Sequence, residues 1–460
     1  MIAADLADAF VSLLGAAHVR ADADSRILYG TDALKRGAPA DLVVFPGTTE
    51  EVAAVVRICA ERRLPMVPRG AGTGYTGGSV PTRGGVVVSL ERMNRILEID
   101  EANLIAIVEP NVVTGDLQDA AEKVGLFYPP DPASLRQSVI GGNVAECAGG
   151  PRAFKYGTTK RYVLGLEAVL PTGEVVRTGG KVVKNVVGYD LTQLLVGSEG
   201  TLAIITKIIL RLVPKPPLQI TLRATFPDVE SSAAAVVNIT RARVVPAALE
   251  LIDGDSLEAV ARNLNVRSLA PEGTAALLLL EVDGIAEAIG EEASRVEQAC
   301  REAGATEVLR ARTEEERQEL WRVRRELSLS LKMIASLKLN HDVVVPKGRI
   351  PDLFALVRGI RERFNLRIPC FGHAGDGNIH VNIMVDKDNA QEIARAHQAE
   401  EVLFAGVIAL EGSISGEHGI GFAKAKFLPL ELSEDEIALM KRVKQAFDPG
   451  GILNPGKLFP

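Results

Sequence analysis

The sequence is poor in aromatic residues and in cysteine, and it has no excess of basic residues. Aromatic residues make up 4% of the 460 residues, which leaves little stacking surface for nucleic-acid bases. The 52 basic residues are outnumbered by 59 acidic ones, and the formal net charge of −7 disfavours binding to a phosphate backbone. No two cysteines have a C-x-x-C spacing, so we exclude an iron–sulfur cluster and a structural zinc site of that type. The scattered thiols are Cys59, Cys147, Cys300 and Cys370.

Long hydrophobic runs are also missing. No uninterrupted apolar stretch reaches the roughly 18 residues that a transmembrane helix needs. The first eight residues carry two acids and lack the pattern of a secretory signal. We therefore expect a cytoplasmic protein. The chain is 47% apolar and long enough for several hydrophobic cores, which excludes a disordered protein and a small disulfide scaffold.

The pattern of the first half predicts a mixed α+β fold. Residues 49–63 have apolar groups at helical spacing, with acids in the first turn and arginines in the last. A second helix is expected at 116–124. Short β-rich runs between turns predict strands at 85–90, 95–99, 104–109, 164–170 and 174–177.

A boundary between domains is expected near residue 215. A long β-branched run at 201–213 ends in a proline-rich segment, 214–217, which is typical of an exit from a domain. Beyond it, strands alternate with helices, as in a sheet covered on one face by helices. The expected strands are 218–226 and 275–282, and the expected helices are 232–240, 286–303, 314–331 and 433–446.

A glycine-rich loop at 68–78 (PRGAGTGYTGG) contains a G-x-G-x-x-G match at 72–77. In a nucleotide-binding Rossmann fold this turn opens a helix, whereas residues 78–85 here cannot form one. Five glycines in nine residues exceed what a plain turn requires. The segment is better interpreted as an extended loop whose backbone amides surround a diphosphate.

Together with three further motifs, this loop resembles the FAD-binding oxidoreductases of the vanillyl-alcohol oxidase type. The other motifs are 129–134 (PPDPAS), 140–150 (IGGNVAECAGG) and 196–206 (VGSEGTLAIIT). Within that family the chain is similar to the glycolate oxidase FAD subunit, D-lactate dehydrogenase and D-2-hydroxyglutarate dehydrogenase group, over nearly all of its length. The resemblance implies an α+β protein with a two-part FAD-binding domain at 1–215, an α+β substrate (cap) domain at 216–417 that carries a metal motif, and a C-terminal segment, 418–460, that returns to the FAD domain.

The resemblance also implies which residues contact FAD. In the family the first loop and the Gly-Gly-Asn segment hold the diphosphate and flavin, and the Gly-Ser-Glu-Gly-Thr segment supports the adenosine end. Covalent attachment is not expected, because the only histidine before residue 341 is His18, outside these motifs. The implied contacts are Pro68, Arg69, Gly70, Ala71, Gly72, Thr73, Gly74, Gly77, Gly78, Pro132, Ser134, Gly141, Gly142, Ala145, Cys147, Ala148, Gly149, Gly157, Glu199, Gly200, Ile205 and Asn454.

Five of the six histidines lie between residues 341 and 418, and three of them fall within two tight motifs. In 372–382 (GHAGDGNIHVN) a glycine turn between two strands predicts a hairpin that brings His373 and His380 together. In 415–421 (SGEHGIG), Glu417 could complete a set of two histidines and one carboxylate, if the backbone there is irregular. The same motifs in the D-2-hydroxyacid dehydrogenases bind a divalent metal, which implies that His373, His380 and Glu417 bind Zn, Mn or Fe here.

A guanidinium group suits the recognition of a substrate carboxylate. In relatives the Arg three positions after a tryptophan binds the acid, which implies Arg324, with Ser328 as a helper. The neighbouring Arg322 and Arg325 are interpreted as surface charges. Hydroxyglutarate enzymes have a substrate-binding Lys at the position of Asn340, so a dicarboxylate is a less favoured substrate.

The expected reaction is the oxidation of a D-2-hydroxy acid, of the lactate, glycolate or 2-hydroxyglutarate type, by hydride transfer to FAD. In it His418 takes the hydroxyl proton and Asn382 orients the substrate. Electrons then pass to an iron–sulfur subunit, an electron-transfer flavoprotein or the quinone pool, and we also consider a homodimer. Two alternatives remain open: a group-transfer enzyme of the alkylglycerone phosphate synthase type, and a noncatalytic flavin subunit of a larger oxidase.

Overall fold

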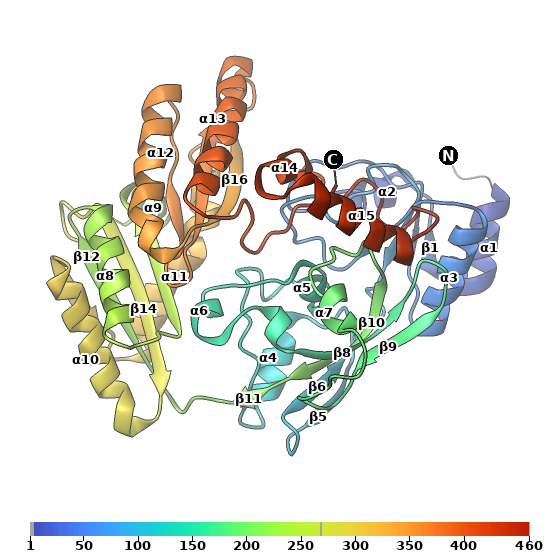
Figure 1. Ribbon diagram of the computed structural model, residues 1–460, viewed down its shortest axis with the longest axis horizontal. Coiled ribbons are helices and arrows are strands. Elements are labelled where there is room, and N and C mark those ends of the chain that lie inside the picture. The colour runs from blue at the N-terminus through green and yellow to red at the C-terminus, as the bar shows by residue number, and fades with distance from the viewer. Residues whose placement is uncertain (1–3, 267–268, 460) are drawn as a thin grey trace. The chain divides into compact units, whose positions relative to one another are not determined.

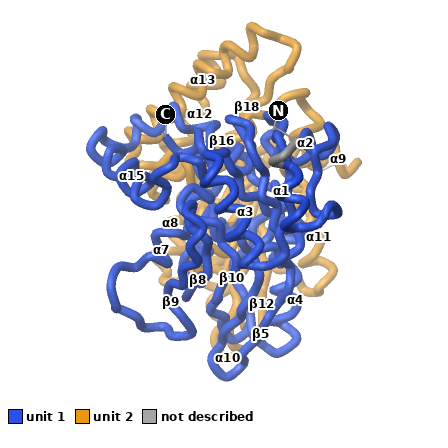
Figure 2. Tube along the Cα trace, turned by 90° about the vertical axis from the view of Figure 1, so that its right-hand side faces the viewer, with its two compact units in different colours: residues 1–149, 158–215, 417–460 blue, residues 150–157, 216–416 orange. Residues whose placement is uncertain are grey.

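The computed structural model describes residues 4–266 and 269–459, and the chain divides into two compact units (Figure 2). Unit 1 comprises residues 1–149, 158–215 and 417–460, and unit 2 comprises residues 150–157 and 216–416. The division differs from the expected boundaries in two details. Residues 150–157 belong to unit 2, and Glu417 is the first residue of the C-terminal part of unit 1.

Unit 1 contains two main sheets. The first has the order β1-β2-β4-β3, in which β2, β4 and β3 are parallel and β1 is antiparallel. The second is antiparallel with the order β5-β6-β10-β8-β9, and β11 pairs with β7 outside it. The strands are β1 (Val19–Arg20), β2 (Leu42–Val44), β3 (Met66–Arg69), β4 (Val86–Ser89), β5 (Ile96–Asp100), β6 (Ile105–Val108), β7 (Leu126–Phe127), β8 (Val163–Val169), β9 (Val175–Gly179), β10 (Ile204–Arg211) and β11 (Val213–Pro214).

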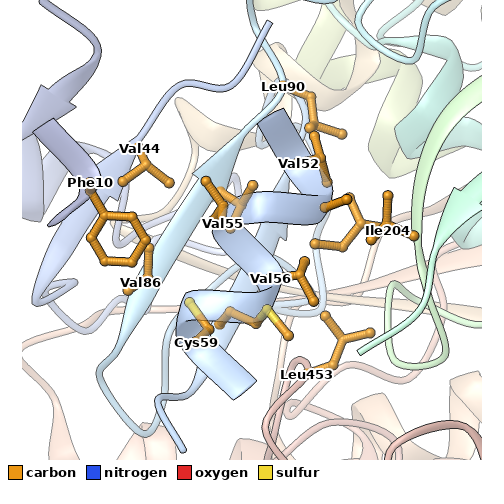
Figure 3. Packing of buried hydrophobic residues seen from close by; sticks show 14 of the residues in the cluster. Phe10, Val44, Val52, Val55, Val56, Cys59, Val86, Leu90, Ile204 and Leu453 are labelled. Atoms are coloured by element: carbon orange, nitrogen blue, oxygen red, sulfur yellow. The ribbon is translucent and has the colours of Figure 1, made fainter. Parts of the chain in front are cut away.

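The core of unit 1 forms around α3 (Thr49–Glu61), which lies close to the predicted helix (Figure 3). The side chain of Thr48 caps this helix by accepting from the amide of Glu51, and Glu50 lies in the favourable first turn. The apolar face of α3 is fully buried against the strands of the first sheet and α1 (Ala4–Leu14). The packing thus fixes the position of β3, from whose end the glycine-rich loop begins.

The other helices of unit 1 are short, except the last. The helix α15 lies within one residue of the predicted helix 433–446 and begins after Ser433, whose side chain and that of Glu436 form a reciprocal capping box. These helices are α2 (Ala23–Leu28), α4 (Thr114–Glu122), α5 (Ile140–Glu146), α7 (Leu191–Leu195), α14 (Leu428–Glu431) and α15 (Glu434–Phe447).

Unit 2 is built on an antiparallel seven-stranded sheet with the order β15-β12-β14-β13-β17-β18-β16 (Figure 1). The central strand β14 is an almost continuous apolar run, as expected for a strand covered on both faces. The strands are β12 (Leu218–Phe226), β13 (Ala248–Asp253), β14 (Ala276–Gly284), β15 (Glu307–Arg310), β16 (Leu337–Val344), β17 (Cys370–His373) and β18 (Asn378–Val385).

Helices cover both faces of this sheet, whereas the sequence predicts helices on one face only. On one face α9 and α11 pack on Ile252, Leu279 and Phe371, and α8, α10, α12 and α13 lie on the other, where α12 and α13 run side by side (Figure 1). In the described part of the chain, none of the helices has the length and apolar character required to cross a bilayer. The helices of unit 2 are α6 (Ala153–Tyr156), α8 (Val229–Arg241), α9 (Gly254–Asn263), α10 (Ala286–Glu302), α11 (Glu314–Lys332), α12 (Ile350–Phe364) and α13 (Ala390–Ala409).

Candidate active site

The glycine-rich loop of unit 1 leaves β3 without forming a helix. Gly72 and Gly77 have φ values of 68° and 81°, a left-handed backbone that favours glycine. Among the described residues, none accepts a hydrogen bond from the backbone amides of residues 71–76. Arg69 braces the loop, because its guanidinium donates to the carbonyl of Thr31 (2.8 Å) and to the hydroxyl of Ser79 (3.2 Å).

The second glycine motif, 140–150, lies directly against this loop. A Cβ atom at Gly70 would lie 2.6 Å from Val139 Cγ2 and 3.9 Å from the backbone N of Gly142. At Gly141 a Cβ would lie 2.6 Å from Pro110 Cβ. The motif contains the helix α5, so the segment is not merely a loop. The glycines are needed because the backbones approach too closely for a side chain.

The third motif, 196–206, is joined to α5 by backbone hydrogen bonds. The amide of Glu199 donates to the carbonyl of Ala145 (2.8 Å). Asn454, near the end of the chain, donates to the carbonyls of Gly78 (2.9 Å) and Glu199 (2.8 Å). A Cβ at Gly200 would lie 2.7 Å from Pro68 Cγ. Unit 1 therefore gathers four separate segments at the end of β3.

The remaining residues expected to contact FAD lie around these segments. Cys147 has a left-handed backbone (φ 55°), and its Sγ lies 3.3 Å from the hydroxyl of Thr158. Ile205 lies within β10, opposite Ala168. The carbonyls of Pro132 and Ser134 accept hydrogen bonds within their own turn, Ala148 accepts from Thr159, and Gly157 ends α6 in unit 2.

This arrangement fits a dinucleotide. A run of amides without protein acceptors, on a glycine backbone, is a donor set suited to the oxygens of a diphosphate. Among the described residues, none except the chain neighbours of Gly74 comes within 4 Å of a Cβ built there, so there is open space beside the loop.

Two glutamates, the half-buried Glu146 and the buried Glu199, lie beneath these motifs, and the sequence does not predict their pairing. Burial and then the charge of Glu199 raise the pKa of Glu146 well above its usual value. Glu199 accepts hydrogen bonds from the amides of Ile420 and Gly421 (both 2.7 Å). A Cβ at Gly419 would lie 2.3 Å from Glu146 Oε2. The 415–421 motif therefore needs a glycine where its backbone packs against the two carboxylates.

The 415–421 segment is irregular, as the sequence requires if Glu417 and His418 are to serve one site. In unit 1 the His418 ring stacks at 5.3 Å from the ring of Tyr75, in the glycine-rich loop, and its carbonyl accepts from Thr76 (3.0 Å). A Cβ at Gly149 would lie 2.8 Å from the Glu417 carboxylate. Both side chains thus lie next to segments of unit 1 that are expected to bind flavin.

Unit 2 places the remaining candidate residues on one face of its sheet. The strands β17 and β18 form the predicted hairpin, and the rings of His373 and His380 lie 5.5 Å apart between centroids. Asn382 lies on the same face of β18, where it donates to the carbonyl of His380 (3.1 Å) and accepts from Asn340 (2.7 Å). The helix α11 covers this face.

A buried carboxylate, Glu250, links two of these candidates. It lies in β13 opposite His373, whose Nδ1–H donates to it (2.5 Å), and it also accepts from Nε of Arg324. Burial alone would raise the pKa of Glu250, but its interactions with His373 and Arg324 outweigh this and lower it to about 2. Among the described residues, none accepts from the two Nη groups of Arg324, which therefore offer a fork for a carboxylate.

A second carboxylate, Asp342, lies beside His380, with 3.8 Å between Asp342 Oδ1 and His380 Nδ1. Asn378 donates to Asp342 (2.6 Å), and so does the backbone amide of Gly416 (2.9 Å). Gly416 is the last residue of unit 2 and precedes Glu417 directly. The donor set of two histidines with adjacent carboxylates suits a divalent transition metal.

The sequence reasoning missed Glu250 and Asp342. Glu250 lies within the largely apolar strand 248–253, and Asp342 directly precedes the apolar residues 343–345. Buried carboxylates in such positions need a partner, and that requirement is the signal that could have identified them.

Residues 40–179 match a family model described as "FAD binding domain", and residues 215–458, more than half of the chain, match "FAD linked oxidases, C-terminal domain". The glycolate oxidase subunit GlcD of Bacillus subtilis is 42% identical over 100% of this chain and 97% of its own length. A D-lactate dehydrogenase of Anaerostipes hadrus is 38% identical over 95% of this chain and 91% of its own.

Among solved structures, p-cresol methylhydroxylase with substrate bound superposes with a TM-score of 0.82 at 19% identity, covering 99% of this chain and 96% of that one. An alkyldihydroxyacetonephosphate synthase superposes with a TM-score of 0.77 at 18% identity, covering 99% and 86%. At these identities the likeness concerns the fold. The chain therefore belongs to the FAD-linked oxidase family and is a flavin-dependent oxidoreductase with the vanillyl-alcohol oxidase type of fold, as the sequence motifs predict.

Proposed function

We propose that this protein is an FAD-dependent, metal-assisted dehydrogenase that oxidises a D-2-hydroxy acid to the 2-oxo acid. The observation that carries the proposal is the polar face of unit 2, where His373, His380 and the Nη groups of Arg324 are gathered by β13, β17, β18 and α11. Relatives named glycolate oxidase subunit and D-lactate dehydrogenase support the same substrate class.

The residues divide the work as follows. Arg324 would bind the α-carboxylate through its two Nη groups, in the bidentate geometry that guanidinium favours. His373, His380 and Glu417 would hold the divalent ion. Asn382, fixed by Asn340 and the strand backbone, would limit the orientations of the acid.

His418 would take the proton of the substrate hydroxyl. A neutral imidazole nitrogen can accept a proton, and packing against Tyr75 fixes the position of this ring in unit 1. When bound, FAD would supply a hydride acceptor, and the ion would act as a Lewis acid that lowers the pKa of the hydroxyl. The FAD would be held noncovalently by the glycine segments at the end of β3.

Electrons must then leave the flavin. The relatives from Bacillus subtilis and Escherichia coli are named as subunits, which supports transfer to a partner protein. An iron–sulfur subunit, an electron-transfer flavoprotein or the quinone pool would serve.

The direct test is an anaerobic screen of the flavin-loaded protein with D-lactate, L-lactate, glycolate, D-malate and D-2-hydroxyglutarate. We expect at least one D-acid or glycolate to bleach the visible absorbance of the flavin, and L-lactate to leave it unchanged. If every acid leaves the flavin oxidised, the proposal is wrong, and the group-transfer alternative gains support.

A further inference from the structure

Glu250 connects two side chains to which the proposed function gives different tasks. It is fully buried in β13, and its two carboxylate oxygens have different partners. Oε1 accepts from Nδ1 of His373 at 2.5 Å, and Oε2 accepts from Nε of Arg324. One partner lies on the neighbouring strand β17 and the other on α11, so a single carboxylate joins the sheet to the helix above it.

These two bonds decide which atoms remain available. Because a carboxylate only accepts, the neutral imidazole of His373 carries its proton on Nδ1, and Nε2 is then the atom whose lone pair can coordinate an ion. Because Arg324 uses Nε for Glu250, its two Nη groups are left for a substrate carboxylate. Phe371, whose ring lies 5.0 Å from the Arg324 guanidinium carbon, further restrains that group.

We propose that Glu250 is a positioning residue that holds His373 in the tautomer able to bind the ion and, with its other oxygen, holds Arg324 in place to bind the acid. The inference rests on the proposed function, and it adds a residue that couples binding of the ion to binding of the substrate. A carboxylate behind a metal-binding histidine commonly sets the tautomer and strengthens the ligand.

A merely structural role for Glu250 is the competing explanation, and Glu281 offers a matched control. Glu281 is also buried, with 1% of its surface exposed, and it lies on the adjacent strand β14. It too contacts α11, through Trp321 Nε1 (2.9 Å) and Arg317 (3.6 Å). Glu281→Gln thus removes a buried charge under the same helix without touching His373 or Arg324.

The test measures two affinities of the flavin-loaded, full-length protein: that for Zn²⁺, by competition with a chelator, and the KM for D-lactate with an artificial electron acceptor. Glu250→Gln should weaken Zn²⁺ binding about 10- to 100-fold and raise the KM for D-lactate, whereas Glu281→Gln should change both less than about threefold. Glu250→Asp should recover part of both affinities. Unchanged Zn²⁺ affinity and KM in a folded Glu250→Gln protein would overturn the inference.

A second measurement needs no change at Glu250. In protein labelled with ¹⁵N-histidine, the signals of His373, identified by their loss in His373→Gln, should show a protonated Nδ1, and Zn²⁺ should shift the Nε2 signal. A proton on Nε2, or a shift of Nδ1 on addition of Zn²⁺, would contradict the inference. Failure of the unaltered protein to bind Zn²⁺ or to be reduced by any acid would instead count against the proposed function itself.

Discussion

At the scale of single residues, the proposed binding of the substrate carboxylate depends on Arg324. Its fork of two Nη groups matches a carboxylate, whereas the ammonium group of lysine is a point charge without that geometry. Arg324→Lys should therefore raise the KM for the acid substrate about 10- to 100-fold, equivalent to roughly 1.5–3 kcal/mol for a hydrogen bond to a charged group.

Steady-state kinetics with an artificial acceptor would measure this effect. Arg322→Lys provides the control, since Arg322 lies on the exposed side of the same helix and pairs with Glu319. Equal KM values in Arg324→Lys and in the unaltered protein would remove Arg324 from substrate binding.

The lowered pKa of Lys338 leads to a prediction about how the stability of the protein depends on pH. Burial, followed by the charge of Lys332, lowers its pKa to about 8, and its ammonium donates to the hydroxyl of Ser328 (2.9 Å). Between about pH 8 and the ordinary pKa of 10.5, the unfolded chain binds a proton that the folded chain does not, so raising the pH stabilises the folded state through this group. Lys338→Met should thus be more stable at pH 7, by about 1–3 kcal/mol, and lose this advantage as pH rises from 8 to 10.5.

Urea unfolding followed by the fluorescence of Trp321, the single tryptophan of the chain, would measure that difference in unit 2. Lys332→Met, at an exposed position, controls for the loss of a positive charge. A constant difference between Lys338→Met and the unaltered protein across this pH range would show that Lys338 keeps an ordinary pKa.

Residue patterns predict the site only where the residues are close in sequence. The hairpin that joins His373 and His380 follows from a glycine turn between two β-rich runs. The bond between Glu250 and His373 joins residues 123 positions apart, and no local pattern specifies that register. Similarly, the pairing of Glu146 with Glu199 arises only when α5 meets the 196–206 motif.

At the scale of elements, the close packing of α5 leads to a testable prediction about FAD binding. Gly141 is the second residue of this helix; its amide donates to the carbonyl of Pro110 (2.7 Å), and a Cβ there would lie 2.9 Å from that same oxygen. Gly141→Ala must displace the start of α5 from the glycine-rich loop. The purified variant should therefore contain less FAD, with an affinity at least about tenfold weaker and a destabilisation of about 1–3 kcal/mol.

The ratio of visible to ultraviolet absorbance would measure the flavin content, and a titration with FAD would measure the affinity. Gly290→Ala, in α10, should retain full flavin content, because its Cβ would meet no described residue within 4 Å apart from its chain neighbours and the backbone of its own helix. Full flavin content in Gly141→Ala would mean that the position of α5 does not matter for FAD.

Periodicity predicts the long amphipathic helices well. The expected helices 286–303, 314–331 and 433–446 agree within one residue at each end with α10, α11 and α15. The helix α5 was not predicted, because Gly141 and Gly142 are poor helix formers and only tertiary packing favours the helix there. Helix propensity reflects only the local sequence, whereas Gly141 is required by a close tertiary contact with Pro110.

At the scale of the whole molecule, the proline-rich segment 214–217 lies where the chain passes from unit 1 to unit 2, whereas the return near residue 418 is expected only from the family resemblance. The sequence does not predict that residues 150–157 belong to unit 2. That assignment depends on α6, where Lys155 and Tyr156 both bind Asp283, more than 120 positions away. The roles of the two units, FAD binding and substrate binding, stay predictions.

The central claim is that flavin reduction by a 2-hydroxy acid depends on a divalent ion held by His373, His380 and Glu417. The most direct measurement follows the visible flavin absorbance after anaerobic mixing with D-lactate, before and after removal of metal by a chelator and again after adding Zn²⁺ or Mn²⁺. His380→Ala and the control His397→Ala, whose histidine is exposed on α13, are measured in parallel. We predict that removing the metal abolishes the bleaching and that returning it restores the bleaching. Bleaching should be absent in His380→Ala and normal in His397→Ala. Equal bleaching in the stripped protein or in His380→Ala would contradict the proposed role of the ion.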